Sequence, residues 1–472
     1  MNEDRFFLIN RGSLEERLDP LFYKPSIRAF VNSLLTSKHF TAKPLHKLAV
    51  RIVDGPFGTQ LKVDDYREEG VPVIRVSNVR TGEISEDKLI KISAEKHKDI
   101  RRSRVVPNDV LLTKAGAILG YSAVFPEHLK EGNITSHSVT ITCTDEILPH
   151  YLKYIFHSEI GQKQIYRWGN KSTRPELNTQ EVKKIIIPVL PKAQQQKIID
   201  TYHEAIAKRK KNQQKAKDLL NNISTYLLNE LGITLPPQPV STIENRMYKT
   251  SWQKVTGKRL DPFYNQDYFK QLNNSVTKGK LKAVFLKEII SSGLIKGYLP
   301  KAAEKFGSNK VVQINCINED GSFSLDDVLT AKDVFRKNQK LLKKDILVVI
   351  TGATIGKIGF WENENNYMLG GDIVKFQTAY KINPYYIFSY LRSKPAQTEI
   401  KRSITGATNG HLSPTDVKHI LIPIPTNQND DALIDKIAEK MKEMREDAYK
   451  LQAEAISEFE KSKKEIEKII LE

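Results

Sequence analysis

Apolar and polar positions follow two different periods along the chain. Short runs rich in β-branched residues and bounded by turn residues, such as VPVIRVSNV (71–79) and DILVVI (345–350), predict strands. Runs with aromatic and aliphatic residues at helical intervals, such as HYLKYIFHSEIGQKQIY (150–166) and PYYIFSYLRSKPAQTEI (384–400), predict helices. Strands and helices are interspersed, so the pattern predicts a mixed α and β fold.

Two stretches with almost no glycine or proline carry the apolar stripe of a long helix. In the later stretch the steps alternate between three and four residues, which is the seam of a coiled coil, through Ile434, Ile437, Met441, Met444, Ala448, Leu451 and Ala455. Ile456, Phe459, Lys463, Ile466 and Ile470 continue this seam one position out of phase. The earlier stretch carries Ile199, Tyr202 and Ile206, a polar middle KRKKNQQK, and then Ala216, Leu220, Ile223 and Leu227.

The chain contains an internal repeat. RLDPLFY (17–23) and RLDPFY (259–264) are nearly the same word, and DVLLTKAGAILGYSAVF (109–125) aligns with DILVVITGATIGKIGFW (345–361). LNTQEVKKIIIPVLP (177–191) likewise aligns with LSPTDVKHILIPIP (412–425), and VIRVSNV (73–79) with VVQINCI (311–317). Blocks that recur in one order at nearly one offset indicate a tandem duplication.

The repeat and the helices together predict four segments. Residues 1–191 and 233–426 form two similar α/β domains, and residues 192–232 and 427–472 form spacer helices of about 60 Å each at about 1.5 Å per residue. GITLPPQPV (232–240) is too short to return the chain to its start, so the second helix must run antiparallel to the first. We expect a two-helix coiled-coil spacer with approximate two-fold symmetry. The alternative is that each helix packs separately on its own domain.

Charge points to a polyanionic partner. The 472-residue chain has a net charge of +18, with +6 in residues 1–191 and +12 in residues 233–426, while the two helical segments cancel. Such an excess favours nucleic acid through counterion release. No apolar run is long enough for a membrane helix and the start MNEDRFFLIN lacks a signal-peptide pattern, so a cytoplasmic protein is expected. Cys143 and Cys316 form no CxxC motif, so neither a disulfide framework nor a metal site is indicated.

Matched glycine loops follow a predicted strand in each repeat. KAGAILG (114–120) and TGATIG (351–356) have two glycines separated by three residues, a place where backbone amides approach a phosphate. Lys114 begins the first loop and Lys357 follows the second, so both are candidate DNA contacts. The spacing is not that of a Walker loop. A simple bend between two strands is the alternative.

Further candidate DNA contacts lie in a second pair of loops and at one aligned position. GNKSTRPELN (169–178) and TGATNGHLSP (405–414) carry Lys171, Arg174, Asn409 and His411. Helix capping by Asn178 or Ser413 explains part of these loops without a ligand. Arg75 aligns with Gln313 and Arg174 with Asn409, and arginine favours guanine whereas asparagine and glutamine favour adenine. The two half-sites are therefore expected to differ.

Catalytic signals are weak. NPYY (383–386) is similar to the Asn-Pro-Pro-aromatic loop of DNA amino-methyltransferases, but the aligned residues in the first repeat share only the proline. Glu86, Asp87 and Lys88 have a spacing found in some nucleases, which a chain with 28% charged residues reaches by chance. No glycine-rich cofactor loop opens either half. We therefore expect no catalytic residue, no cofactor and no metal.

Two basic α/β units with RLDP near the start of each, and junctions IIIPVLPKAQQQKII and LIPIPTNQNDDALI, resemble the specificity subunit of type I restriction-modification systems. The resemblance implies two target-recognition domains that read a bipartite, gapped, asymmetric site in double-stranded DNA. It also implies a non-catalytic chain whose partners are two methyltransferase subunits and the restriction and translocase subunits. The junctions depart from the family pattern at Lys192, Gln194, Asn427 and Gln428.

Two other classes of protein remain open on the sequence. A DNA-modifying enzyme, either an adenine methyltransferase or a nuclease, would need its own active site, and labelled S-adenosylmethionine with DNA would expose it. A coiled-coil scaffold without a DNA role would leave the charge of the two α/β units unexplained. A gel shift with DNA at two salt concentrations would distinguish such a scaffold from a DNA-binding protein.

Overall fold

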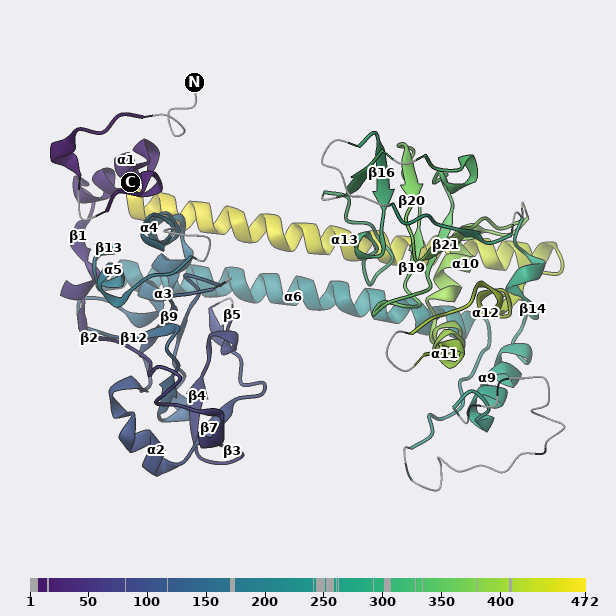
Figure 1. The fold of residues 1–472 in the computed structure, drawn as a ribbon, viewed down its shortest axis with the longest axis horizontal. Helices are drawn as coiled ribbons and strands as arrows, with labels where there is room; N and C mark the ends of the chain where they lie inside the picture. Colours follow the sequence, from purple (N-terminus) through teal and green to yellow (C-terminus); the bar gives the residue numbers. More distant parts are fainter. Residues whose placement is uncertain are drawn as a thin grey trace. The chain divides into compact units, whose positions relative to one another are not determined.

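The computed structural model describes residues 7–472 apart from residues 15–16, 81, 117, 170–174, 241, 243–250, 252–258, 260, 262, 292, 301–306, 327, 333, 380 and 407–409. The chain forms two compact units. The first unit is made of Met1–Lys211 and Glu454–Glu472, and the second unit of Asn212–Ala453. Each unit therefore contains one copy of the repeat together with part of each long helix (Figure 1).

The first unit is a mixed α and β domain. Its helices are α1 (Pro25–Leu35), α2 (Ala94–Asp99), α3 (Pro149–His157), α4 (Glu159–Gly169), α5 (Thr179–Lys183) and the first part of α6 (Lys192–Glu230). Its strands are β1 (Thr41–Pro44), β2 (Ala49–Asp54), β3 (Tyr66–Arg67), β4 (Val71–Ile74), β5 (Val79–Arg80), β6 (Glu83–Ile84), β7 (Ile90–Ile92), β8 (Arg104–Val105), β9 (Val110–Thr113), β10 (Ser122–Val124), β11 (Gly132–Ile134), β12 (Ser138–Cys143) and β13 (Ile186–Val189).

Two larger sheets organise this unit. The antiparallel sheet has the strand order β10-β9-β12-β2, and the mixed sheet has the order β3-β7-β4-β11-β8 with β4 and β11 parallel. Helix α3 buries aromatic side chains, including Tyr151 and Phe156, in the same core as Val110 of β9 and Ile141 of β12. Burial of such large apolar side chains is the main stabilising term of the unit.

The second unit repeats this plan. Its helices are α9 (Asp267–Thr277), α10 (Pro384–Leu391), α11 (Lys394–Ser403), α12 (Pro414–Lys418), the last part of α6 and the first part of α13 (Gln428–Leu471). Its strands are β14 (Lys282–Phe285), β15 (Ile295–Lys296), β16 (Asn309–Val312), β17 (Leu329–Ala331), β18 (Ile346–Val349), β19 (Ile358–Phe360), β20 (Tyr367–Leu369), β21 (Ile373–Phe376) and β22 (Leu421–Ile424).

The antiparallel sheet of the second unit matches that of the first strand by strand, and the three strands of its mixed sheet match the three central strands of the first. The order β19-β18-β21-β15 matches β10-β9-β12-β2, and β17-β16-β20 matches β7-β4-β11, again with one parallel pair. The register also agrees, because Val110 pairs with Ile141 in the first unit and Ile346 pairs with Phe376 in the second. The predicted mixed α and β fold and its tandem duplication are confirmed.

Helices α6 and α13 lie side by side and run antiparallel in the first unit (Figure 1). Tyr202 of α6 packs against Phe459 of α13 with ring centroids 5.8 Å apart. Six residues further along α6, Lys208 Nζ lies 3.0 Å from the carboxylate of Glu458. In the second unit, five of the predicted stripe residues are buried in one core, namely Ile223 and Leu227 of α6 and Ile434, Ile437 and Met441 of α13.

One part of the predicted seam is wrong. Ile456 was expected to continue the stripe, but its side chain is 55% exposed, whereas Ala455 and Phe459 are buried. The stripe therefore passes from Ala455 to Phe459 in one step of four residues, directly after the step of four from Leu451 to Ala455. Phe459, Ile466 and Ile470 are buried and lie one position out of phase with the earlier seam, as predicted. The small side chain of Ala455 leaves room for the bulk of Phe459 and Tyr202.

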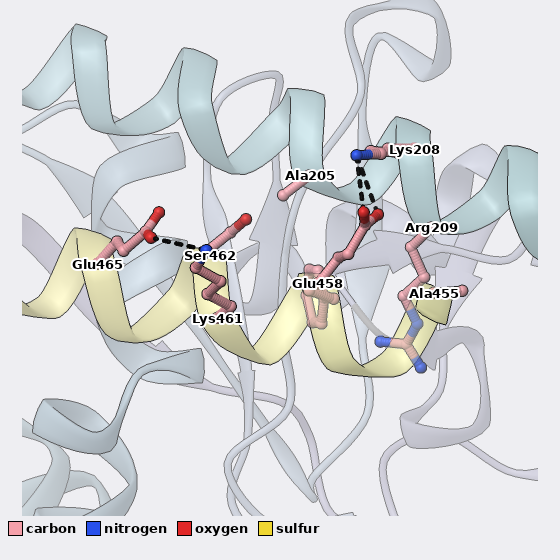
Figure 2. Close-up of a pocket in the computed structure, with 9 residues that line it drawn as sticks. Ala205, Lys208, Arg209, Ala455, Glu458, Lys461, Ser462 and Glu465 are labelled. Carbon is pink, nitrogen blue, oxygen red and sulfur yellow. Dashed lines mark hydrogen bonds and ion pairs between the residues drawn. The ribbon is translucent and has the colours of Figure 1, made fainter. Parts of the chain in front are cut away.

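A groove follows this part of the seam within the first unit (Figure 2). Small side chains at Ala205 and Ala455 open it, and its rim is charged, with Lys208 paired to Glu458 and Lys461 3.9 Å from Glu465. Arg209 also lines the groove, so three cations face two carboxylates and the rim carries a small positive excess.

The repeated Arg-Leu-Asp-Pro word has a structural role in both units. Arg17 Nη1 donates to the carbonyl of Trp168 in α4 at 2.7 Å, and Arg259 Nη1 donates to the carbonyl of Ser403 in α11 at 2.8 Å. These carbonyls lie in the last turn of a helix, where no intrahelical N–H reaches them and a cation is favoured. Each arginine thus ties the start of a repeat to the end of a distant helix.

The aspartate of the same word orders the turn that follows it. Asp19 Oδ1 accepts the amide of Phe22 at 3.1 Å, and Asp261 Oδ1 accepts the amide of Tyr264 at 2.9 Å. Each aspartate also holds its arginine, with Nε to Oδ2 distances of 2.7 Å. The Arg-Leu-Asp-Pro motif occurs twice because each unit uses the same arginine and aspartate contacts to fix the start of its repeat against a distant helix.

Candidate nucleic-acid interface

Four strand ends of the first unit place their loops at one edge of the antiparallel sheet. Strand β2 ends at Asp54 opposite Val139 of β12, and β9 ends at Thr113 opposite Ser138. We call the resulting loops, residues 54–62, 114–121, 135–137 and 175–179, edge 1, of which residue 117 lies outside the described part of the chain. Backbone bonds join them: Gly55 N donates to Ser138 O at 3.3 Å, and Lys114 N donates to His137 O at 2.8 Å.

The second unit has an equivalent edge. Strand β15 ends at Lys296 opposite Val374 of β21, and β18 ends at Val349 opposite Ile373. Residues 296–300, 350–357, 370–372 and 405–412 form edge 2, of which residues 407–409 lie outside the described part of the chain. Leu412 N donates to Ile350 O at 2.8 Å, as Leu177 N donates to Lys114 O at 2.7 Å in edge 1.

The matched glycine loops are bends between two strands. Gly116 and Gly352 have φ of +89° and +83°, and Gly120 and Gly356 have φ of +84° and +88°, which only glycine adopts readily. The amides of Gly120 and Gly356 donate to the carbonyls at the end of the preceding strand, both at 2.9 Å. These two amides therefore close a hairpin, which is the bend alternative raised by the sequence.

Arg75 and Gln313 occupy the same place in the two units. Each precedes a short 3₁₀ turn, Val76–Asn78 or Ile314–Cys316, at the end of the central strand of the mixed sheet. Arg75 is partly buried and its guanidinium donates to Lys88 O at 3.0 Å. Both lie beside an edge, because the preceding carbonyls accept the amides of Thr135 at 3.3 Å and Gly370 at 2.9 Å.

The remaining candidates differ in how accessible they are. Lys114 is buried, and its Nζ lies 3.5 Å from Asp54 Oδ2, so this cation stabilises a carboxylate of edge 1 and does not face solvent. Lys357 Nζ lies 2.8 Å from Glu319 and is largely covered. His411 is exposed, and its backbone pairs with Thr405 in both directions. Lys171, Arg174 and Asn409 lie outside the described residues.

The structure adds a charged cluster that the sequence did not single out. Asp54 Oδ1 accepts a hydrogen bond from Arg102 Nη2 at 3.0 Å, while Asp54 Oδ2 lies 3.5 Å from Lys114 Nζ and accepts from Thr179 Oγ1 at 3.3 Å. These four residues come from four separate segments, so no local motif reveals them. The signal in the sequence was the three arginines in RRSR (101–104) together with a strand that ends in aspartate.

Edge 2 differs at the equivalent position. Lys296 stands where edge 1 has Asp54, since each lies opposite the matched valine, Val374 or Val139. The two edges therefore share a backbone plan and present opposite charges at this point. Among the described residues, no group of three or more histidine, cysteine, aspartate or glutamate side chains is arranged to hold a metal ion, and no helix is long and apolar enough to cross a membrane.

Comparisons with known proteins agree with this architecture. Residues 279–461 match the family model described as type I restriction modification DNA specificity domain. The EcoBI specificity subunit of a type I restriction enzyme from Escherichia coli is 27% identical over 179 residues, which are 36% of this chain and 36% of that protein. The match thus spans about a third of the relative's length.

A solved structure of low sequence identity shares the fold. A chain described in work on complex assembly and conformational transition of the type I R-M system is 12% identical with a TM-score of 0.52, and the match covers 91% of this chain and 97% of that chain. The S subunit of a type I system from M. genitalium is 13% identical with a TM-score of 0.42, covering 91% and 98%. Residues 279–461, most of which lie in the second unit, thus match the type I restriction modification DNA specificity domain, and the fold of the chain is similar to that of a chain from a type I R-M system.

Proposed function

We propose that this chain is the non-catalytic subunit that selects the DNA sequence for a type I restriction-modification assembly. Edge 1 reads one half of a bipartite, gapped site and edge 2 reads the other half. Methyltransferase subunits, two per chain, and restriction and translocase subunits supply the chemistry. The observation that carries the proposal is that the two edges share one backbone arrangement but have different side chains. Different hydrogen-bond donors and acceptors on equivalent surfaces suit two half-sites of different DNA sequence.

The excess of cations should make DNA binding strongly dependent on salt. The +18 net charge lies in the two α/β units, and each phosphate contact releases counterions. We expect affinity for duplex DNA to fall about 1,000-fold between roughly 50 and 200 mM salt, the loss typical of six or more phosphate contacts. Fluorescence anisotropy with a labelled duplex measures this slope. A flat response would contradict binding through phosphates.

Exchanging one whole unit tests whether each edge reads its own half-site. The core of the first unit includes Tyr202 of α6 and Phe459 and Ile470 of α13, so a chimera cut at residue 191 would lose that packing. The chimera should instead take residues 1–211 and 454–472 from a relative of different specificity. With partner subunits present, mapping of methylated sites should show one half changed and the other half kept.

The reciprocal chimera, which replaces residues 212–453, is the matched control. It should change the other half of the site and keep the first. If either chimera changes both halves, or if an active chimera changes neither, the two units do not read separate half-sites.

A further inference from the structure

An exposed arginine beside edge 1 is held by a carboxylate of that edge. Arg102 lies in the 3₁₀ turn Arg101–Ser103 that leads into β8, and its side chain is 78% exposed. Its Nη2 donates to Asp54 Oδ1 at 3.0 Å. That bond uses one of the five N–H donors of the guanidinium, and the high exposure leaves the rest of the group facing solvent.

Asp54 is itself fixed. Its backbone belongs to the β2–β12 ladder, and its Oδ2 accepts from Thr179 Oγ1 at the start of α5. The buried Lys114 ammonium lies 3.5 Å from the same oxygen. Since Lys114 is too buried to reach a ligand, its effect is to hold the carboxylate, and the carboxylate in turn holds Arg102.

The turn beneath Arg102 is tied to both sheets. Ser103 is buried, and its hydroxyl accepts from Asn133 Nδ2 of β11 at 3.0 Å. Arg51 of β2 donates through Nη2 to the carbonyl of Arg104 at 2.8 Å. The exposed guanidinium therefore sits on a rigid support, which reduces the entropy lost when it binds.

We infer that Arg102 reads a guanine in the half-site taken by the first unit, an inference that rests on the proposed function. A guanidinium donates two parallel N–H bonds to O6 and N7 of guanine in the major groove. The carboxylate of Asp54 offsets the positive charge and repels phosphate oxygens, so a phosphate is the poorer ligand here. A base edge carries no net charge and instead requires a donor pair in fixed orientation, which Asp54 provides.

The second unit carries a different reader at the same place. Arg104 pairs with Asn133, and Lys340 bridges to Met368 at the equivalent position, so Arg102 corresponds to Asn338. Asn338 is exposed, and the nearby strand end carries Lys296 in place of Asp54. Asparagine favours adenine in the major groove. The two half-sites should therefore differ at the position that this turn reads.

Selection from a randomised duplex pool tests the assignment with the full-length chain. We expect wild-type protein to recover a motif with a guanine at one position of one half-site, and Arg102→Ala to lower that guanine preference roughly 10- to 100-fold while keeping the rest of the motif. Arg102→Lys keeps the charge and loses the paired donors, so it should restore affinity without restoring the preference. Arg101→Ala is the control, because Arg101 is its exposed neighbour and should affect all sequences equally.

Asp54→Asn tests the positioning role. It should weaken the preference for guanine at the position assigned to Arg102 and leave the rest of the motif unchanged, which a general loss of stability would not do. A melting curve measures any loss of thermal stability caused by leaving Lys114 without its carboxylate. A uniform loss of affinity in Arg102→Ala, an unchanged motif, or altered positions in both half-sites would overturn the assignment. If wild-type protein selects no motif at all, the proposed function itself fails, whatever the variants do.

Discussion

Replacing Lys375 with methionine should lower the free energy of unfolding of the second unit by about 3–5 kcal/mol, the usual cost of leaving a buried charge without its partner. Lys375 Nζ lies 2.7 Å from Asp345 Oδ2, and the two side chains are only 3% and 2% exposed. Asp345 also accepts the amide of Leu342 at 2.8 Å and a hydrogen bond from the side chain of Gln377, but two neutral donors do not replace the cation beside a carboxylate out of water.

The first unit offers a matched control. Asp109 is the equivalent of Asp345, but its cation is Arg51 of β2, whose side chain is 32% exposed, at 3.0 Å. Asp109 also accepts from Thr142 Oγ1 at 2.6 Å and from the amide of Val106 at 2.9 Å. We expect Arg51→Met to cost about half as much as Lys375→Met, because Arg51 is partly exposed and water can take the place of its guanidinium, whereas Lys375 is fully buried.

Hydrogen exchange of the full-length chain measures the loss of stability in each unit separately. It is followed in β18 and β21 for Lys375→Met and in β9 and β12 for Arg51→Met. A double variant, Lys375→Met with Asp345→Leu, should recover much of the stability because no charge is then buried. If Lys375→Met costs no more than Arg51→Met, the pair at Asp345 does not carry its charge in the folded state.

The aspartates were visible in the sequence, but their partners were not. Aligning the repeats places Asp109 on Asp345 directly, since both follow a loop and open a buried strand. Their cations come from different strands, Arg51 from β2 and Lys375 from β21, so no single offset relates them. The period of apolar residues fixes the strands, whereas the choice of which strand supplies a buried cation depends on packing between segments far apart in sequence.

The same limit applies to the candidate site. The alignment of Arg75 with Gln313 correctly placed two side chains at equivalent points beside the edges. It did not reveal Asp54 and Arg102, because their contact joins segments 48 positions apart and depends on where β2 ends. Lys114 looked like a free cation in a glycine loop, and only the fold shows that its side chain turns inward to Asp54.

Acid should weaken the first unit selectively. Burial, with the nearby Lys153 as a smaller cause, lowers the pKa of His157 from 6.5 to about 4, and the same two causes lower the pKa of His150 to about 4. His157 Nε2 accepts the amide of Ser122 at 3.1 Å, so a proton on that nitrogen would remove the acceptor. The folded state therefore prefers the neutral imidazoles.

The sign of the effect follows from linkage. Between pH 6.5 and 4 the unfolded chain binds more protons at these histidines than the folded chain, so stability falls as pH falls through this window. The stability is fully present above pH 6.5. With about 1.4 kcal/mol for each unit of pKa, discounted for partial exposure, we expect a loss of roughly 3 kcal/mol for the pair. Urea unfolding at several pH values, with hydrogen exchange to separate the units, measures it.

Two variants and the second unit serve as controls. His157→Gln removes one titrating group and should flatten the pH dependence by about half, whatever its effect at neutral pH. Lys153 is buried and its own pKa is lowered to about 8, so Lys153→Met should both stabilise the unit at neutral pH and raise the two histidine pKa values. The equivalent of Lys153 in the second unit is Phe388, and none of the equivalent positions is histidine, so acid should leave that unit's protection nearly constant over this window. Equal loss of protection in both units would mean that these histidines do not cause the acid sensitivity.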